Sequence, residues 1–115
     1  MIQTRTVTLE IPIPQLTLEH GLWGLVALAI AADLITTQLG LANGLVESNP
    51  AARGALEYGT LGFLAMKGGA VALAATLRLA VPRSERWIPP ACLAAVWLGA
   101  ALWNAHLLAR VGVLA

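Results

Sequence analysis

Two oppositely charged residues, Asp33 and Lys67, each interrupt a long apolar stretch of the sequence. Asp33 lies about eleven residues after Leu22, or roughly 16 Å along a helix, which is near the middle of a hydrocarbon core about 30 Å thick. Lys67 lies at a similar depth in the second stretch, counted from the opposite side. A charge at that depth costs roughly 2.5 to 3.5 kcal/mol by insertion scales, so it needs a partner and marks a candidate functional site. We therefore predict an Asp33–Lys67 ion pair, which can either lock helices together or serve an ion or proton path.

Polar residues near Asp33 strengthen the prediction of a polar centre. Thr36 and Thr37 follow it at offsets of three and four, so all three side chains share one helical face. Such a small, hydrogen-bonding face suits close contact between membrane helices. Asn104 in the third apolar stretch is a further candidate for this centre.

The third stretch has two distinct faces, and the sequence does not decide between them. One carries Trp97 and Asn104, and the opposite one carries Trp103 and His106. Either face can pack against the other helices, and the remaining one is then a candidate subunit interface or lies near the outer headgroups.

The loop after the first stretch contains the run Glu47-Ser48-Asn49-Pro50. Asn49 has the side chain of a helix N-cap, and Pro50 fits the first helical position, where no backbone N–H is required. The alternative is a proton or metal site that uses Glu47. The capping interpretation has the stronger support, because cap residues of this kind are common.

Together these residues resemble an uncharacterised family of small prokaryotic multi-pass membrane proteins. The pattern lies within about residues 21–110, and its elements are Asp33 with Thr36 and Thr37, Gly44, Glu47 with Asn49 and Pro50, Lys67, and Asn104. The resemblance implies a multi-pass architecture and supports the choice of these residues. It implies no particular activity.

The elements that must position these residues are three transmembrane helices. Hydrophobic residues make up 58% of the 115 residues and charged residues only 11%, against roughly 45–50% and 25% in soluble domains. We predict an all-α membrane fold in which a three-helix domain, residues 18–115, follows a short extended arm. The expected spans are 18–41, 55–80 and 88–111. The arm, residues 1–17, alternates apolar and polar residues but contains Pro12 and Pro14, which confine it to an edge strand or an extended segment.

Lys and Arg near the span ends predict the orientation. Four arginines fall on one side and two on the other: Arg5, Arg78, Arg83 and Arg86 against Arg53 and Arg110. The positive-inside rule then places the N-terminus in the cytoplasm, and the family resemblance implies the plasma membrane of a prokaryotic cell.

Several function classes receive no support from the sequence. A net charge of +1 without a basic, aromatic-rich run argues against nucleic-acid binding. Cys92 is the single cysteine, and no nucleotide loop or metalloprotease helix is present, so we expect no catalytic residue, metal or cofactor. The partners expected are the lipid bilayer and further copies of the chain or a larger membrane complex. The predicted function is a structural or accessory subunit that oligomerises around the Asp33/Lys67 centre; the alternative is an oligomeric ion or proton channel that uses Asp33, Lys67 and Glu47.

Overall fold

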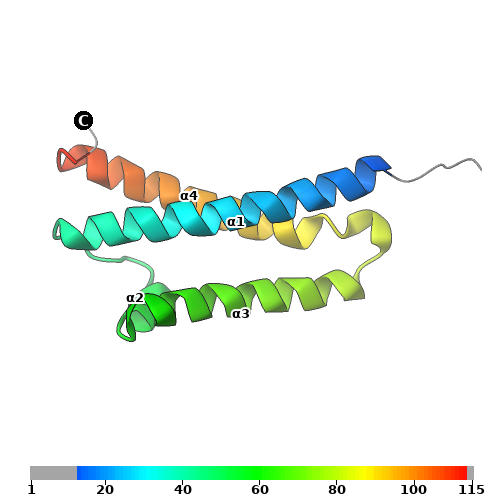
Figure 1. Cartoon of the computed structure of the whole chain (residues 1–115), viewed down its shortest axis with the longest axis horizontal. Coiled ribbons are helices and arrows are strands. Elements are labelled where there is room, and N and C mark those ends of the chain that lie inside the picture. Colours follow the sequence, from blue (N-terminus) through cyan, green and yellow to red (C-terminus); the bar gives the residue numbers. More distant parts are fainter. Residues whose placement is uncertain (1–12, 114–115) are drawn as a thin grey trace, which may run out of the picture.

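The computed structural model describes residues 13–113, which form helices joined by short loops (Figure 1). The elements, in chain order, are α1 Ile13–Ala42, α2 Pro50–Leu56, α3 Gly59–Ala80, the 3-10 helix η1 Arg83–Glu85, and α4 Ile88–Arg110. Three segments are long and apolar enough to cross a membrane: Leu18–Ala42, Gly59–Ala80 and Arg83–Arg110. The predicted all-helical architecture with three potential spans is confirmed, and the chain has the features of a small membrane protein.

The first helix begins earlier than predicted. Residues 13–17, which we expected to be extended, are helical in the structure. Pro14 is compatible with this position because the first helical residues have no intrahelical acceptor for their N–H groups. The strand-like alternation was therefore the wrong interpretation for these five residues. The rest of the predicted arm, residues 1–12, lies outside the described part of the chain.

The second predicted span is broken near its start. Residues 55–58 do not continue into the long helix: α2 ends at Leu56, and α3 begins at Gly59. Gly59 has a φ of +80°, a conformation that favours glycine, and this allows the chain to turn between the two helices. α2 then packs closely against α3, because a Cβ atom at Gly62 would collide with the carbonyl oxygen of Ala55.

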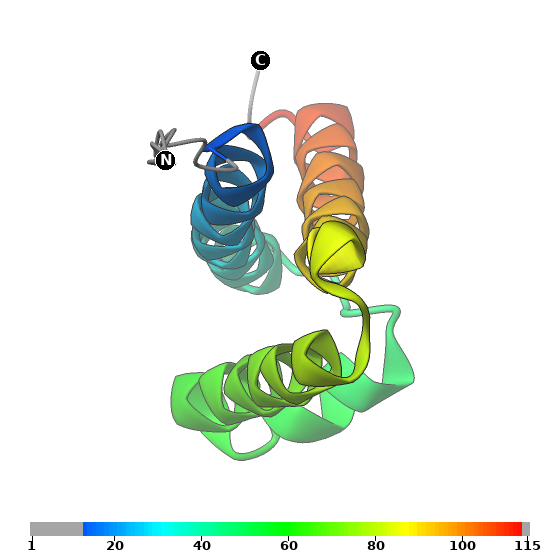
Figure 2. The same cartoon turned by 90° about the vertical axis from the view of Figure 1, so that its right-hand side faces the viewer.

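The three long helices do not pack equally. α1 and α4 run side by side over much of their length, whereas α3 lies apart from them with α2 beside it (Figures 1 and 2). The hydrophobic core accordingly joins α1 to α4, and it is formed by Val26 and Ala29 together with Ala94 and Trp97. α3 also contacts α4. Its connection to α1 is made by polar side chains long enough to reach across the space between the two helices.

Candidate functional site

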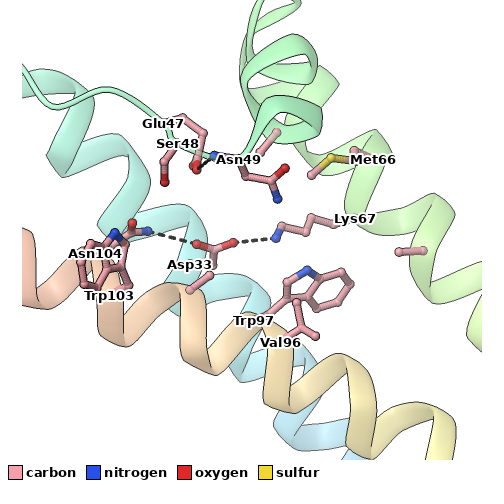
Figure 3. A pocket seen from close by; sticks show the side chains of 13 residues that line it. Asp33, Glu47, Ser48, Asn49, Met66, Lys67, Val96, Trp97, Trp103 and Asn104 are labelled. Carbon is pink, nitrogen blue, oxygen red and sulfur yellow. Dashed lines mark hydrogen bonds and ion pairs between the residues drawn. The ribbon is translucent and has the colours of Figure 1, made fainter.

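Asp33 of α1 and Lys67 of α3 form a buried ion pair. The Nζ atom of Lys67 lies 2.6 Å from Oδ2 of Asp33, and each residue is only 4% exposed (Figure 3). The predicted pairing of these two charges is therefore present within one chain. Because the ammonium and the carboxylate are buried together, neither charge is left alone in an apolar environment.

Two aromatic rings complete the surroundings of the lysine. The ammonium lies 4.9 Å from the ring centre of Phe63, one turn earlier on α3, and 4.5 Å from that of Trp97 on α4. A cation over the face of an aromatic ring is attracted to the electron-rich face, and the attraction is stronger where water is excluded. Lys67 thus contacts both of the other long helices, through Asp33 on α1 and Trp97 on α4.

The second carboxylate oxygen of Asp33 binds groups from α4 and from its own helix. Oδ1 accepts hydrogen bonds from Nδ2 of Asn104 at 3.1 Å and from the hydroxyl of Thr37 at 3.4 Å. The amide of Asn104 also lies 3.0 Å from Oγ1 of Thr36, whose hydroxyl donates to the carbonyl of Ala32 at 2.8 Å. Both oxygens of Asp33 are therefore occupied, and all three long helices contribute to the polar centre.

These contacts decide which face of α4 points inward. Trp97 is buried and Asn104 reaches Asp33, whereas Trp103 and His106 are exposed and stack on each other at 5.5 Å. The face that carries Asn104 is thus the one that packs on the bundle.

The loop before α2 is held in place by backbone contacts. The side chain of Asn49 accepts a hydrogen bond from the N–H of Ala51 at 3.0 Å, and Pro50 occupies the first helical turn, which confirms the predicted cap. Oε1 of Glu47 accepts from the N–H of Asn49 at 3.0 Å. Arg53, a residue of α2, donates from Nε to the carbonyl of Glu47 at 2.9 Å and so fixes the loop that precedes the helix.

This loop and the buried ion pair line the same cavity, of about 410 Å³ (Figure 3). The residues that contribute polar groups to its wall are Asp33, Glu47, Ser48, Asn49, Lys67 and Asn104. Thr36 and Thr37 line a smaller neighbouring cavity of about 20 Å³, together with Glu47 and Asn104. Of the residues singled out in the sequence, Pro50 lines neither of these two cavities and starts α2 instead; Gly44 and His106 also lie outside both walls.

A family model described as a domain of unknown function (DUF5658) matches residues 24–110. The chain belongs to this family. All the residues of the polar centre and the Glu47–Pro50 loop lie inside the matched segment, so they belong to the part of the chain that defines its DUF5658 membership. No curated protein and no solved structure matches the chain. The match is consistent with the resemblance to an uncharacterised family, and it assigns no activity.

The sequence analysis missed a second ion pair between α1 and α3 of this DUF5658 protein. Arg78 binds Glu19, and its Nη2 lies 3.2 Å from Oε1 of that carboxylate. Trp23 donates its indole N–H to the same carboxylate at 3.1 Å, and Glu19 is only 5% exposed. The spacing along the helices could have predicted this pair. Arg78 follows Lys67 by eleven residues and Glu19 precedes Asp33 by fourteen, so in antiparallel helices both lie at a similar distance from the central pair.

A third polar contact links the same two helices toward the other end. Nε2 of Gln38 donates to the hydroxyl of Thr60 at 3.1 Å. α1 and α3 are thus connected at three levels by polar side chains, with the buried Asp33–Lys67 pair in the middle.

The described residues contain no group of three or more His, Cys, Asp or Glu side chains placed to hold a metal ion. Cys92 is a free, exposed thiol on α4. The cavity wall offers an ion pair, amides, a hydroxyl and indole rings.

Proposed function

We propose that this DUF5658 protein is a structural or accessory subunit of a membrane assembly, and that its polar centre fixes the arrangement of its three long helices. The observation that supports this most directly is the complete pairing of Asp33. One carboxylate oxygen binds Lys67 of α3, and the other binds Asn104 of α4. A carboxylate used in this way holds three helices together.

The physics of the bilayer favours such a role for polar groups. Apolar side chains gain little by leaving lipid for another helix, so helix association depends on van der Waals packing and interhelical hydrogen bonds. α3 depends on these polar contacts more than the other helices do, because the apolar core joins α1 to α4. Without the Asp33–Lys67 pair, α3 would lose its central connection to α1.

The partners that we propose are further copies of the chain or other membrane proteins. α3 leaves a face of small residues exposed, which includes Ala65, Gly68, Gly69 and Ala72. Small residues allow the backbones of neighbouring membrane helices to approach closely. We also propose the plasma membrane of a prokaryote with a cytoplasmic N-terminus, from the excess of arginines at that end of the helices.

A second candidate function is ion or proton transport by an oligomer. The cavity of about 410 Å³ favours it, because Glu47 at the loop and Asp33 within the span line the same space. A symmetric pore would require the Asp33 face to point toward an axis shared by several chains. The occupation of that face by Lys67 and Asn104 of the same chain favours the structural role instead.

Reconstitution into liposomes distinguishes the two functions. The structural proposal predicts no proton or potassium flux at any pH or potential, together with an assembly of defined mass that Asp33→Asn weakens. His106→Asn, on the exposed face of α4, is the matched control and should leave the assembly intact. A flux that disappears in Asp33→Asn while the assembly keeps its mass would refute the structural role and support transport.

A further inference from the structure

Two adjoining cavities lie along α3 and α4, and we refer to them together as the α3–α4 crevice; its two halves differ in character. One half is the polar cavity of about 410 Å³, and the other is an apolar groove of about 480 Å³. The two halves meet at Ala70, which lines both. Volumes of this size are typical of small-molecule sites, which lie in the range of about 300–1,000 Å³. A crevice with a polar end and an apolar end matches the shape of an amphiphile.

The apolar half is suited to an alkyl chain. Its walls come from α3 and α4, with Leu73 and Leu77 on one side and Ile88 and Leu93 on the other. From Ala70 to the end of α3 the groove extends for about ten residues, or roughly 15 Å. Glu85, at the far end, is the charged residue in this wall.

The polar half favours a cationic head group. Asp33 and Lys67 lie 2.6 Å apart, so their opposite charges largely cancel. Glu47 adds a further negative charge to the wall. The guanidinium of Arg53 binds the carbonyl oxygens of Glu47 and Ser48, and Arg53 is not part of the cavity wall.

Aromatic rings in the same wall add to this preference. Trp97 and Trp103 both line the polar half, and Trp103 is 54% exposed. Indole faces attract ammonium groups, and the ammonium of Lys67 over Trp97 is an example within this protein. The ring of Trp103 lies 5.5 Å from that of His106 and is still half exposed, so the wall contains an anion, Glu47, and a partly exposed indole, the two features that bind an organic ammonium group.

We propose that this α3–α4 crevice binds a single-chain amphiphile with an ammonium head, with the head beside Glu47 and Trp103 and the alkyl chain passing Ala70 into the near part of the groove, toward Cys92. This inference goes beyond the structural role of the polar centre and does not depend on it. An assembly subunit and a transporter alike can carry such a site.

The test uses the whole chain in nanodiscs of zwitterionic lipid, with dodecylammonium as the probe. Two independent readouts report the two halves of the crevice. The indole N–H resonances of Trp97 and Trp103 report the head, and the rate at which N-ethylmaleimide alkylates Cys92, which lines the groove, reports the chain. We expect dodecylammonium to shift the Trp103 resonance and to slow the alkylation of Cys92.

Two further probes separate the head from the chain. Tetramethylammonium should shift Trp103 only at higher concentration and leave the alkylation of Cys92 unchanged. Dodecyl sulfate, which has the opposite head charge, should produce neither effect. Equal effects of the ammonium and the sulfate would overturn the proposal, because the chain would then bind without recognition of the head.

Variants with matched controls complete the test. Glu47→Gln should weaken dodecylammonium binding about tenfold, the size expected for the loss of one favourable charge contact, whereas Glu57→Gln, outside the cavity wall, should not. Leu73→Trp narrows the groove near Ala70 and should reduce the protection of Cys92, whereas Ala75→Phe on another face of α3 should preserve it. The site is refuted if Glu47→Gln and Glu57→Gln bind the probe equally, or if Leu73→Trp leaves the protection of Cys92 unchanged.

Discussion

Lys67 reaches Asp33 across a space that the backbones of α1 and α3 do not close. The 2.6 Å contact between the two side chains is made by the length of the lysine, whose ammonium also lies over the ring of Trp97. The position of α3 relative to α1 therefore depends on a few polar side chains, in addition to the packing of Ala70 and Val71 against the apolar core. The same spacing between the helices leaves the cavity beside the pair.

Asn104 is expected to contribute measurably to this arrangement. Asn104→Leu removes the hydrogen bond to Asp33 and leaves Oδ1 with only the longer contact from Thr37, so we expect a loss of about 1–2 kcal/mol in the free energy of unfolding. Equilibrium unfolding in mixed micelles measures the change. His106→Leu lies on the exposed face of the same helix and should change the stability much less. Equal losses in the two variants would show that Asn104 has no special role.

Two glycines of α3 are expected to respond to alanine in opposite directions. Gly62→Ala would place a Cβ atom against the carbonyl of Ala55, so it should cost about 1–3 kcal/mol through the displacement of α2. At Gly68 an added Cβ meets nothing within 4 Å in the described structure, so in the monomer, at high dilution in micelles, Gly68→Ala should be neutral or stabilise the helix by up to about 1 kcal/mol. Thermal unfolding of both variants tests the pair of predictions. A large loss at Gly68 would instead reveal a contact with a partner helix, and no loss at Gly62 would contradict the close packing of α2.

The cap of α2 should control the order of the loop beside the cavity. Asn49→Ala removes the acceptor for the N–H of Ala51 and should destabilise the helix by about 1 kcal/mol. Hydrogen exchange of the α2 amides, compared with those of α4, measures the effect. Ser48→Ala, the neighbouring substitution, should leave the exchange of α2 nearly unchanged. Faster exchange across the whole protein would mean that the loop has a global role rather than a local one.

The ion pair between Glu19 and Arg78 should contribute less to stability than the pair between Asp33 and Lys67. The side chain of Arg78 is 31% exposed, whereas Glu19 is only 5% exposed and would keep its hydrogen bond from Trp23, so we expect Arg78→Gln to cost about 1–3 kcal/mol. The loss should appear as faster hydrogen exchange near Glu19 and Trp23, at one end of α1. Arg83→Gln, in the adjacent loop, is the control. A loss as large as that caused by removal of Lys67 would contradict the central importance of the buried pair.

The sequence was sufficient to predict the spans and the central ion pair, because their signals are long and strong. An apolar stretch of this length has few explanations other than a transmembrane helix. Two opposite charges at matching depth in neighbouring helices are best accommodated as an ion pair. The break at Gly59 was not predicted, because the end of α2 and the start of α3 together look like one continuous apolar span in the sequence. Residues 13–17 were misjudged because the extended arm was continued past Ile13, where the alternation ends, and Pro14 was taken as a sign of extended chain although it also fits the first turn of a helix.

The candidate site was predictable in its residues and not in its geometry. Asp33, Lys67 and Asn104 could be selected as polar interruptions of apolar helices. The sequence did not show that Asn104 rather than His106 points inward, because that depends on the rotation of α4 against α1. Nor did it show that Glu47 shares a cavity with Asp33, because the loop conformation depends on contacts such as that from Arg53.

A double-mutant cycle on Asp33 and Lys67 tests the central claim most directly. Lys67→Met leaves a buried carboxylate without its counter-charge, and Asp33→Asn leaves a buried ammonium, so each single change should cost about 3–5 kcal/mol in the free energy of unfolding. The double variant removes both charges and should recover most of that loss, which gives a large favourable coupling energy. Unfolding of the four proteins in the same micelles measures the cycle. Losses that simply add in the double variant would contradict the account, because Asp33 and Lys67 would then act independently.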